Sequence, residues 1–266
     1  MNVLTNHSVA GTRRPLATNR EIPQYSLGAL LAIWAAAAVP MGALAWLVAP
    51  RLADRLSGPG EVPMAKALII SLTIGLVWQF VLVAALVGRE QNTLRWKTVK
   101  QALWLTPPTS PRTGRSGGRT WLIVLPLTVA FALAHELIPK FGAPADRDFA
   151  TLLTSDAGKA FLDGAWGWYA LILVMFVFNT ILGEELLFRG FLLPRMNGTF
   201  GRADWIANGL LVTAYHLHVP WAMPTIVLDT FTIVYPSKRY RSAWIGIIVH
   251  SAQSLVVGLL VLGLVL

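Results

Sequence analysis

The sequence predicts an all-α fold, a polytopic transmembrane helical bundle of about 7–8 membrane helices, from three observations. Hydrophobic residues make up 55% of the 266 residues and charged residues only 13%, about half the charged share of a soluble domain. The mean hydropathy is +0.58. Several apolar runs reach the roughly 20 residues that cross about 30 Å of hydrocarbon. These values exclude a disordered chain, a collagen-like chain and an ordinary soluble enzyme.

Five apolar runs predict full membrane spans: 27–49, 66–88, 120–138, 166–188 and 243–266. Two shorter runs, 204–218 and 222–235, predict short, tilted or re-entrant helices, and an eighth helix follows if 189–200 enters the bilayer. The first run is longer than the apolar part of a signal peptide, so we interpret it as an uncleaved span. A polar tail, residues 1–26, precedes it.

The charge distribution predicts orientation and partners. The net charge of +9 comes from basic residues scattered between apolar runs, so we expect contact with the lipid bilayer and no nucleic acid. The loop 89–119 has seven basic residues and one acid, Glu90, which predicts that this loop and the N-terminus lie in the cytoplasm. We therefore expect a multi-pass protein of the cell membrane. The absence of cysteine excludes disulfides, cysteine nucleophiles and thiolate metal sites.

The chain is expected to have three parts. A cytoplasmic tail, 1–26, precedes the N-terminal spans with their basic loop, 27–119, and a C-terminal membrane domain, 120–266, carries the polar residues of interest. Within the basic loop, 92–105 predicts a short helix in the membrane interface. The segment from Pro107 to Gly118 predicts a flexible linker.

Two adjacent carboxylates, Glu184 and Glu185, lie in an apolar run where ionisable groups are costly and commonly functional. Neighbouring residues on a helix point about 100° apart. Glu185 is spaced i, i+4 from Arg189 and can pair with it, whereas Glu184 has no such partner in its own helix. Glu184 is thus the better candidate for a base. The alternative interpretation is a charged helix end at the cytoplasmic surface.

Histidines in the later runs are further candidates. His216 shares a helical stripe with Val212, whereas His218 is expected to face elsewhere. His250 lies inside the last apolar run, with Gln253 and Ser254 on its face. Each histidine also has a structural interpretation: an interfacial ring for His216 and His218, and a hydrogen bond to a neighbouring helix for His250.

Two other ionisable positions favour a structural interpretation. His135-Glu136 begins like a zinc-protease motif, but Pro139 stands where the second histidine is needed. We expect this pair to be solvated at the outer end of its span. Asp229 lies in a short run, and we expect it to be paired or hydrated within the bundle.

The motif Glu-Glu-x-x-x-Arg at 184–189, followed by His216 and His250, resembles the CAAX protease and bacteriocin-processing (CPBP) family of intramembrane endopeptidases, which includes the type II CAAX prenyl proteases. The resemblance covers roughly 120–266. The chain departs from the family pattern at Val212, where Phe is usual, and at Ser254, where Asn or Asp is usual.

The resemblance implies an endopeptidase acting on a membrane-associated peptide or protein. Glu184 with His216 would activate a water, and His250, aided by Ser254, would stabilise the developing oxyanion. Glu185 and Arg189 would hold the helix. The resemblance leaves open whether a divalent metal such as Zn, bound by Glu184, His216 and His250, or a metal-free pair activates the water.

Two other function classes are compatible with these residues. A catalytically silent relative, acting through contacts in immunity or regulation, is favoured by the serine at position 254. A proton-coupled transporter would also use buried Glu, His and Asp residues, but inverted repeats with interrupted helices in matching halves are not evident.

Overall fold

The computed structural model describes residues 22–56, 62–138 and 141–266, so most of the predicted tail 1–26 lies outside the described residues. The described residues form helices and no β-strand, apart from one isolated bridge between Thr109 and Ser116. The predicted all-α bundle is therefore confirmed.

Five helices in the described part are long and apolar enough to cross a membrane: Leu27–Arg55, Pro63–Gln91, Gly118–Leu137, Trp166–Arg195 and Ala243–Val265. They coincide with the five long runs predicted from the sequence. The side chain of Ser26 caps the first helix by accepting from the amide of Ala29, and Asn92 ends the second in a left-handed conformation.

The long helices contain several shorter elements. The first comprises α1 (Leu27–Ala43), η1 (Leu44–Val48) and α2 (Ala49–Arg55), and the second is α3 (Pro63–Gln91). The third comprises η2 (Gly118–Ile123) and α5 (Val124–Leu137). The fourth comprises α8 (Trp166–Val177), η3 (Phe178–Leu182), η4 (Leu186–Leu192) and η5 (Leu193–Arg195), and the fifth is α13 (Ala243–Val265).

The connecting segments are also helical. They are α4 (Trp96–Ala102), α6 (Phe149–Thr154), α7 (Asp156–Leu162), α9 (Asn197–Phe200), η6 (Gly201–Ala203), α10 (Asp204–Tyr215), η7 (His216–His218), η8 (Pro220–Ala222), α11 (Met223–Ile226), η9 (Thr230–Val234) and α12 (Tyr235–Tyr240). The helix expected within 92–105 is α4. The two shorter apolar runs form α10 and the interrupted series of short helices α11, η9 and α12.

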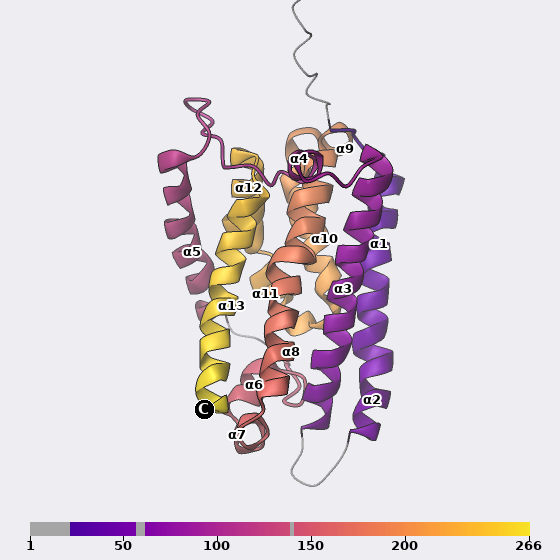
Figure 1. The fold of residues 1–266 in the computed structure, drawn as a ribbon, viewed down its shortest axis with the longest axis vertical. Coiled ribbons are helices and arrows are strands. Elements are labelled where there is room, and N and C mark those ends of the chain that lie inside the picture. The colour runs from indigo at the N-terminus through magenta and orange to yellow at the C-terminus, as the bar shows by residue number, and fades with distance from the viewer. Residues whose placement is uncertain (1–21, 57–61, 139–140) are drawn as a thin grey trace, which may run out of the picture.

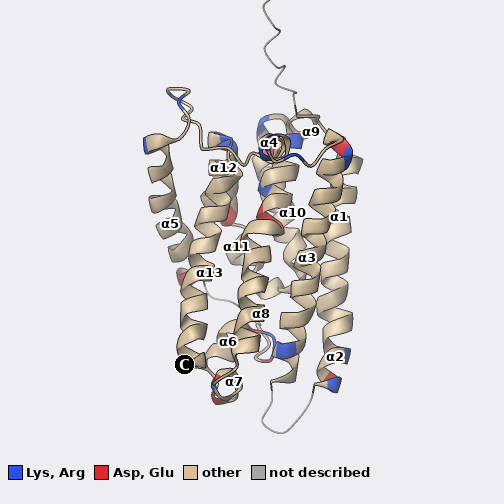
Figure 2. Ribbon diagram, viewed as in Figure 1, with Lys and Arg blue, Asp and Glu red and all other residues tan. Residues whose placement is uncertain are grey.

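The long helices run side by side, with α4 and α9 at one end and α6, α7 and the C-terminus at the other (Figure 1). Lys and Arg gather at the end with α4 and α9 (Figure 2), which we call the basic end. It includes Lys97 of α4, Arg119 of η2, Arg202 of η6, which follows α9, and Lys238 of α12. Helix α5 stands at the edge of the bundle beside α13. In the apolar part of the third long helix, which contains α5, 6% of the residues are buried, against 44% in α3, so the bundle encloses this helix less.

The linker expected at 107–118 is instead a folded loop. Its two arms pair through the bridge between Thr109 and Ser116, and the amide of Ser110 donates to the carbonyl of Arg115 at 2.8 Å. The amide of Thr109 also donates to the carbonyl of Tyr240 at 2.9 Å, which ties the loop to the end of α12. The Pro and Gly residues that indicated a linker serve here as turn residues.

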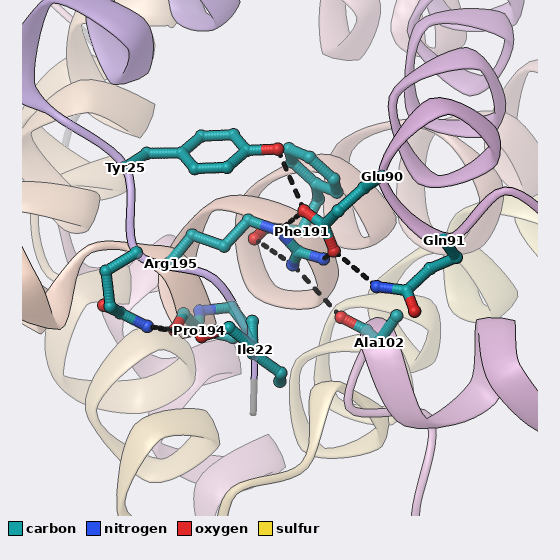
Figure 3. Close-up of polar contacts among 9 residues, drawn as sticks. Ile22, Tyr25, Glu90, Gln91, Ala102, Phe191, Pro194 and Arg195 are labelled. Atoms are coloured by element: carbon teal, nitrogen blue, oxygen red, sulfur yellow. Dashed lines mark hydrogen bonds and ion pairs between the residues drawn. The ribbon is translucent and has the colours of Figure 1, made fainter. Parts of the chain in front are cut away.

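A buried ion pair holds the basic end together (Figure 3). Arg195, which is fully buried, donates to both carboxylate oxygens of Glu90 at 2.7 and 2.6 Å. Its remaining guanidinium nitrogen donates to the carbonyls of Ala102 and Phe191, and the guanidinium stacks on the Phe191 ring. The pair therefore joins α3, α4 and the end of the fourth long helix.

The segment before α1 is attached to the same ion pair. The Tyr25 hydroxyl donates to Glu90 at 2.9 Å, and the amide of Tyr25 donates to the carbonyl of Arg195 at 3.0 Å. Burial and the Glu90 carboxylate raise the pKa of Tyr25, so its hydroxyl stays protonated as a donor at neutral pH. The sole acid of the basic loop is thus the centre of a structural junction.

Arg195→Gln should lower the free energy of unfolding by about 3 kcal/mol, because it leaves the Glu90 carboxylate without its bidentate partner. Thermal unfolding of the purified protein in detergent measures the effect. Arg202→Gln, at an exposed position on the same end, is the matched control and should change little. Equal melting temperatures for the two variants would contradict a structural role for the ion pair.

Candidate functional site

The two adjacent carboxylates lie where the fourth long helix changes its winding. Gly183, with φ −96° and ψ −87°, separates η3 from the residues leading into η4. A side chain there would place Cβ 2.5 Å from the carbonyl oxygen of Phe178 and 3.0 Å from that of Leu76 on α3. Glycine thus permits close approach of two helix backbones directly before Glu184. The segments η3 and η4 on either side of the two glutamates are π-helical, a winding that is frequent at functional sites.

Glu184 faces His216 across the bundle. The His216 Nε2 lies 3.8 Å from the Glu184 Oε2, and both side chains are largely buried. The His216 Nδ1 is 2.8 Å from the carbonyl oxygen of Val212, which can only accept, so Nδ1 carries the proton. In the neutral ring, Nε2 is then an acceptor directed at a carboxylate. The structure thus brings together two residues predicted on separate helices.

Two residues that the sequence did not single out support Glu184. The Tyr215 hydroxyl contacts the Glu184 carboxylate. It also accepts a 2.6 Å hydrogen bond from the side-chain amide of Gln79 on α3. Because the hydroxyl accepts from Gln79, its own proton is available to Glu184. The N-terminal spans, which carry no motif, therefore contribute to the site through Gln79.

Glu185 lies between a cation and a histidine. Its Oε2 is 3.3 Å from the Arg189 Nε, as the i, i+4 spacing predicted, although the angle does not make this contact a hydrogen bond. Its Oε1 is 3.1 Å from the His250 Nδ1. Glu185 therefore orients His250 as well as pairing with Arg189, a contact that sequence spacing alone could not reveal.

Gly246 on α13 makes this contact sterically feasible. A Cβ at that position would lie inside contact distance of the Glu185 Oε2 and 3.0 Å from Ile233. The absence of a side chain lets the carboxylate reach the surface of α13, one turn before His250.

Asp229 is paired with His135, in line with the expectation that it is paired or hydrated within the bundle. The Asp229 Oδ1 lies 3.2 Å from the His135 Nε2, and the His135 Nδ1 is 3.4 Å from the amide nitrogen of Gln253. Asp229 also interacts electrostatically with His216 and His250. The pair His135-Glu136 lies at the end of α5 as expected; Glu136 is exposed, whereas His135 is only partly exposed because its ring contacts Asp229 and Gln253.

His218 does not face away from His216. Helix α10 ends at Tyr215, and residues 216–218 form a tight turn, so the two imidazole rings stack with centroids 5.2 Å apart. The rings lie together at this turn, so the prediction that His218 faces elsewhere is wrong. His218 is buried and hydrogen-bonds the carbonyl of Tyr215 at 3.2 Å.

A cavity of about 590 Å³ lies beside this region; His218 lines it, whereas Glu184, His216 and His250 do not. Its polar wall includes Asn179, His218, Gln253 and Ser254, and its apolar wall includes residues of α3, α8 and α13. Ser254 lies one turn from His250 on α13, but no hydrogen bond joins them in the described structure. Asn179, five residues before Glu184, is a polar group at the cavity that sequence reasoning missed because it lies in no motif.

The predicted metal ligands do not form a three-ligand site. Among residues 22–56, 62–138 and 141–266, no three His, Asp or Glu side chains are grouped so as to hold a metal ion. Glu184 and His216 face each other, whereas the His250 Nδ1 is directed at Glu185. The arrangement fits a two-residue pair, and no catalytic step is assigned to a metal.

Residues 166–256, about a third of the chain, match the family model of the Type II CAAX prenyl endopeptidase Rce1-like proteins. The match contains Glu184, Glu185, Arg189, His216, His250 and Ser254, and it confirms the family resemblance carried by the motifs. At the level of the family, it supports an intramembrane protease of the CAAX type. Comparison with curated proteins and with solved structures gives no match.

Gly246→Ala should lower the free energy of unfolding by about 1–3 kcal/mol, because the added methyl group displaces Glu185. Gly258→Ala is the matched control on the same helix, where the added Cβ meets only Leu173 at 3.5 Å. It should be neutral or slightly stabilising, since alanine favours the helix. Thermal unfolding in detergent compares the two, and an equally stable Gly246→Ala protein would show that α13 does not pack tightly on Glu185.

Proposed function

We propose that this protein is an intramembrane endopeptidase that cleaves a peptide bond of a membrane-associated protein or peptide. The proposal is carried by one observation, the opposition of the Glu184 carboxylate and the His216 Nε2 at 3.8 Å inside a bundle of membrane-spanning length. The family match over 166–256 agrees with this chemistry.

The geometry of the pair suits the activation of water. Both facing atoms are acceptors, and their separation is too long for a direct hydrogen bond. A water molecule that donates one hydrogen to Glu184 and the other to His216 would satisfy both acceptors. Its oxygen is then polarised for attack on a carbonyl carbon. The proton passes to the pair and then to the leaving amine. The Tyr215 hydroxyl holds Glu184 in place.

His250 is proposed to stabilise the negative charge that develops on the carbonyl oxygen. Its Nδ1 is held by Glu185, so its ring orientation is fixed before substrate binds. Arg189 offsets the charge of Glu185, whereas Glu184 has no Lys or Arg partner at ion-pair distance within residues 22–56, 62–138 and 141–266. The two adjacent glutamates thus receive different roles from their different partners.

The substrate class follows from the cavity. A space of about 590 Å³ with an apolar wall and a polar end suits an amphipathic or membrane-anchored segment. We further propose that the protein lies in the cell membrane with its basic end in the cytoplasm, because Lys and Arg concentrate there (Figure 2). This orientation places residue 22, the first described residue, on the cytoplasmic side.

Glu184→Gln should reduce cleavage of membrane-anchored peptides by at least about 100-fold while leaving the melting temperature unchanged, because it removes the base and keeps the shape. Glu185→Gln should lower both stability and kcat, since it weakens contacts to Arg189 and His250. Purified protein in detergent, assayed by mass spectrometry of the products, measures both variants, with Asp163→Asn as an exposed control. Full activity of the Glu184→Gln variant would contradict the proposed role of Glu184 as the base.

Chelation provides an independent measurement. Because the site presents two facing residues and not three grouped ligands, cleavage should persist in EDTA. Loss of activity that added Zn restores would overturn the metal-free form of the proposal. If the wild-type protein cleaves none of a broad set of anchored peptides under either condition, a catalytically silent relative becomes the better interpretation.

Ser254→Ala should lower kcat by about ten-fold with little change in KM, if the hydroxyl at the cavity assists charge stabilisation only as the reaction proceeds. Ser254→Asn should hold or raise kcat. Ser251→Ala is the matched control, because the Ser251 hydroxyl bonds to the Thr180 hydroxyl at 2.9 Å and should affect stability more than rate. An unchanged kcat for Ser254→Ala would assign Ser254 to helix packing.

A further inference from the structure

We propose that the folded loop at the basic end, together with the start of the third long helix, binds the phosphate-bearing headgroup of an anionic membrane lipid. A second cavity, of about 820 Å³, is lined by Ser110, Thr113 and residues 115–120 of the loop, by the start of the third long helix and by Tyr240. Its volume is that of a small-molecule site. None of its lining residues lines the cavity beside Glu184 and His250.

The polar wall of this cavity has the chemistry of an anion site. Arg115 and Arg119 are exposed and line it, and no carboxylate does. Within the described residues, neither guanidinium has an ion-pair partner. Thr120 and Tyr240, whose side chains carry hydroxyl groups, also line the cavity. Guanidinium groups and hydroxyls are the side-chain donors that phosphate oxygens accept from.

The loop is organised before any ligand binds. The bridge between Thr109 and Ser116 closes it, and the Ser116 hydroxyl donates to the carbonyl of Pro107 at 3.0 Å. Gly114, Gly117 and Gly118 adopt positive φ values of 68°, 75° and 55°, which permit the tight reversals between the two arginines and around them. A loop already held in shape loses less conformational entropy on binding than an extended linker would.

The apolar side of the same cavity favours a lipid over a soluble phosphate. Leu122, Ile123 and Pro126 line it at the start of a helix that could cross the membrane, and Leu122 is 60% exposed. A ligand that fits both walls carries its negative charge at the membrane surface and its acyl chains along α5. Basic pockets of this kind on a cytoplasmic membrane face commonly hold anionic headgroups. The inference depends on membrane insertion and not on the proposed protease activity.

The test measures bound lipid and requires no catalytic activity. The full-length protein, purified in detergent, is titrated with dioleoyl phosphatidylglycerol or dioleoyl phosphatidylcholine, and retained lipid is counted by native mass spectrometry. The wild type should retain phosphatidylglycerol preferentially. Arg115→Gln combined with Arg119→Gln should weaken this binding by about ten-fold or more, because two cationic donors are lost.

The control pair, Arg112→Gln with Arg202→Gln, removes the same charge from exposed residues of the basic end that lie outside the cavity wall. It should retain the preference, as should Arg115→Lys with Arg119→Lys, which keeps both charges. An equal loss of phosphatidylglycerol binding in the control pair would mean that the lipid follows the overall positive charge of the basic end, and it would overturn the proposed site. Displacement of the lipid by equimolar glycerol phosphate would assign the site to a soluble anion and would overturn the proposal that its ligand is a membrane lipid. A wild type without preference overturns the proposal without any variant, whether or not peptides are cleaved.

Discussion

The need to compensate every buried charge governs this structure. Within the bundle, an unpaired carboxylate or guanidinium would lack both water and a counter-ion, at a cost of several kcal/mol. Arg195 is therefore matched to Glu90, Asp229 to His135, and Glu185 to Arg189 and His250. Each pair joins different helices or different turns of one helix. The ion pairs consequently fix which helices are neighbours, and apolar packing fills the space between them.

Glu184 stands apart within this scheme. It lies beside His216 and Tyr215, but among the residues that the structure describes no Lys or Arg side chain lies at ion-pair distance from it. The neighbouring Glu185 takes the arginine, and Gly183 and Gly246 bring the surrounding backbones close enough to enclose both carboxylates. Glu184 is thereby held in a low-dielectric setting beside a carboxylate that has its own cationic partner. This division between a compensated and an uncompensated carboxylate is the physical basis for the roles proposed for them.

The peripheral helix α5 is attached to the bundle by few polar contacts. Near its end, His135 reaches Asp229 and Gln253, and its Phe131 lies between the rings of His135 and His250. At its beginning, the folded loop of the basic end precedes it and is tied to α12 through Tyr240. The bundle encloses this helix less than it encloses α3. The position of α5 therefore depends on the packing of Phe131 against Ile233, Ile245 and Val249 and on the polar groups at its two ends.

The sequence by itself determined the helical class, the five long spans and the motif residues, because hydrophobic length and i, i+4 spacing are local properties of the chain. It also placed Glu185 beside Arg189. Only the tertiary structure decided that His250 contacts Glu185, that Gln79 supports Tyr215 and that Arg195 joins Glu90. These contacts join residues 65, 136 and 105 positions apart, and no local spacing encodes them. The prediction that His218 faces away from His216 was wrong. The two rings stack because α10 ends at Tyr215, and tertiary packing, not helical periodicity, sets that end.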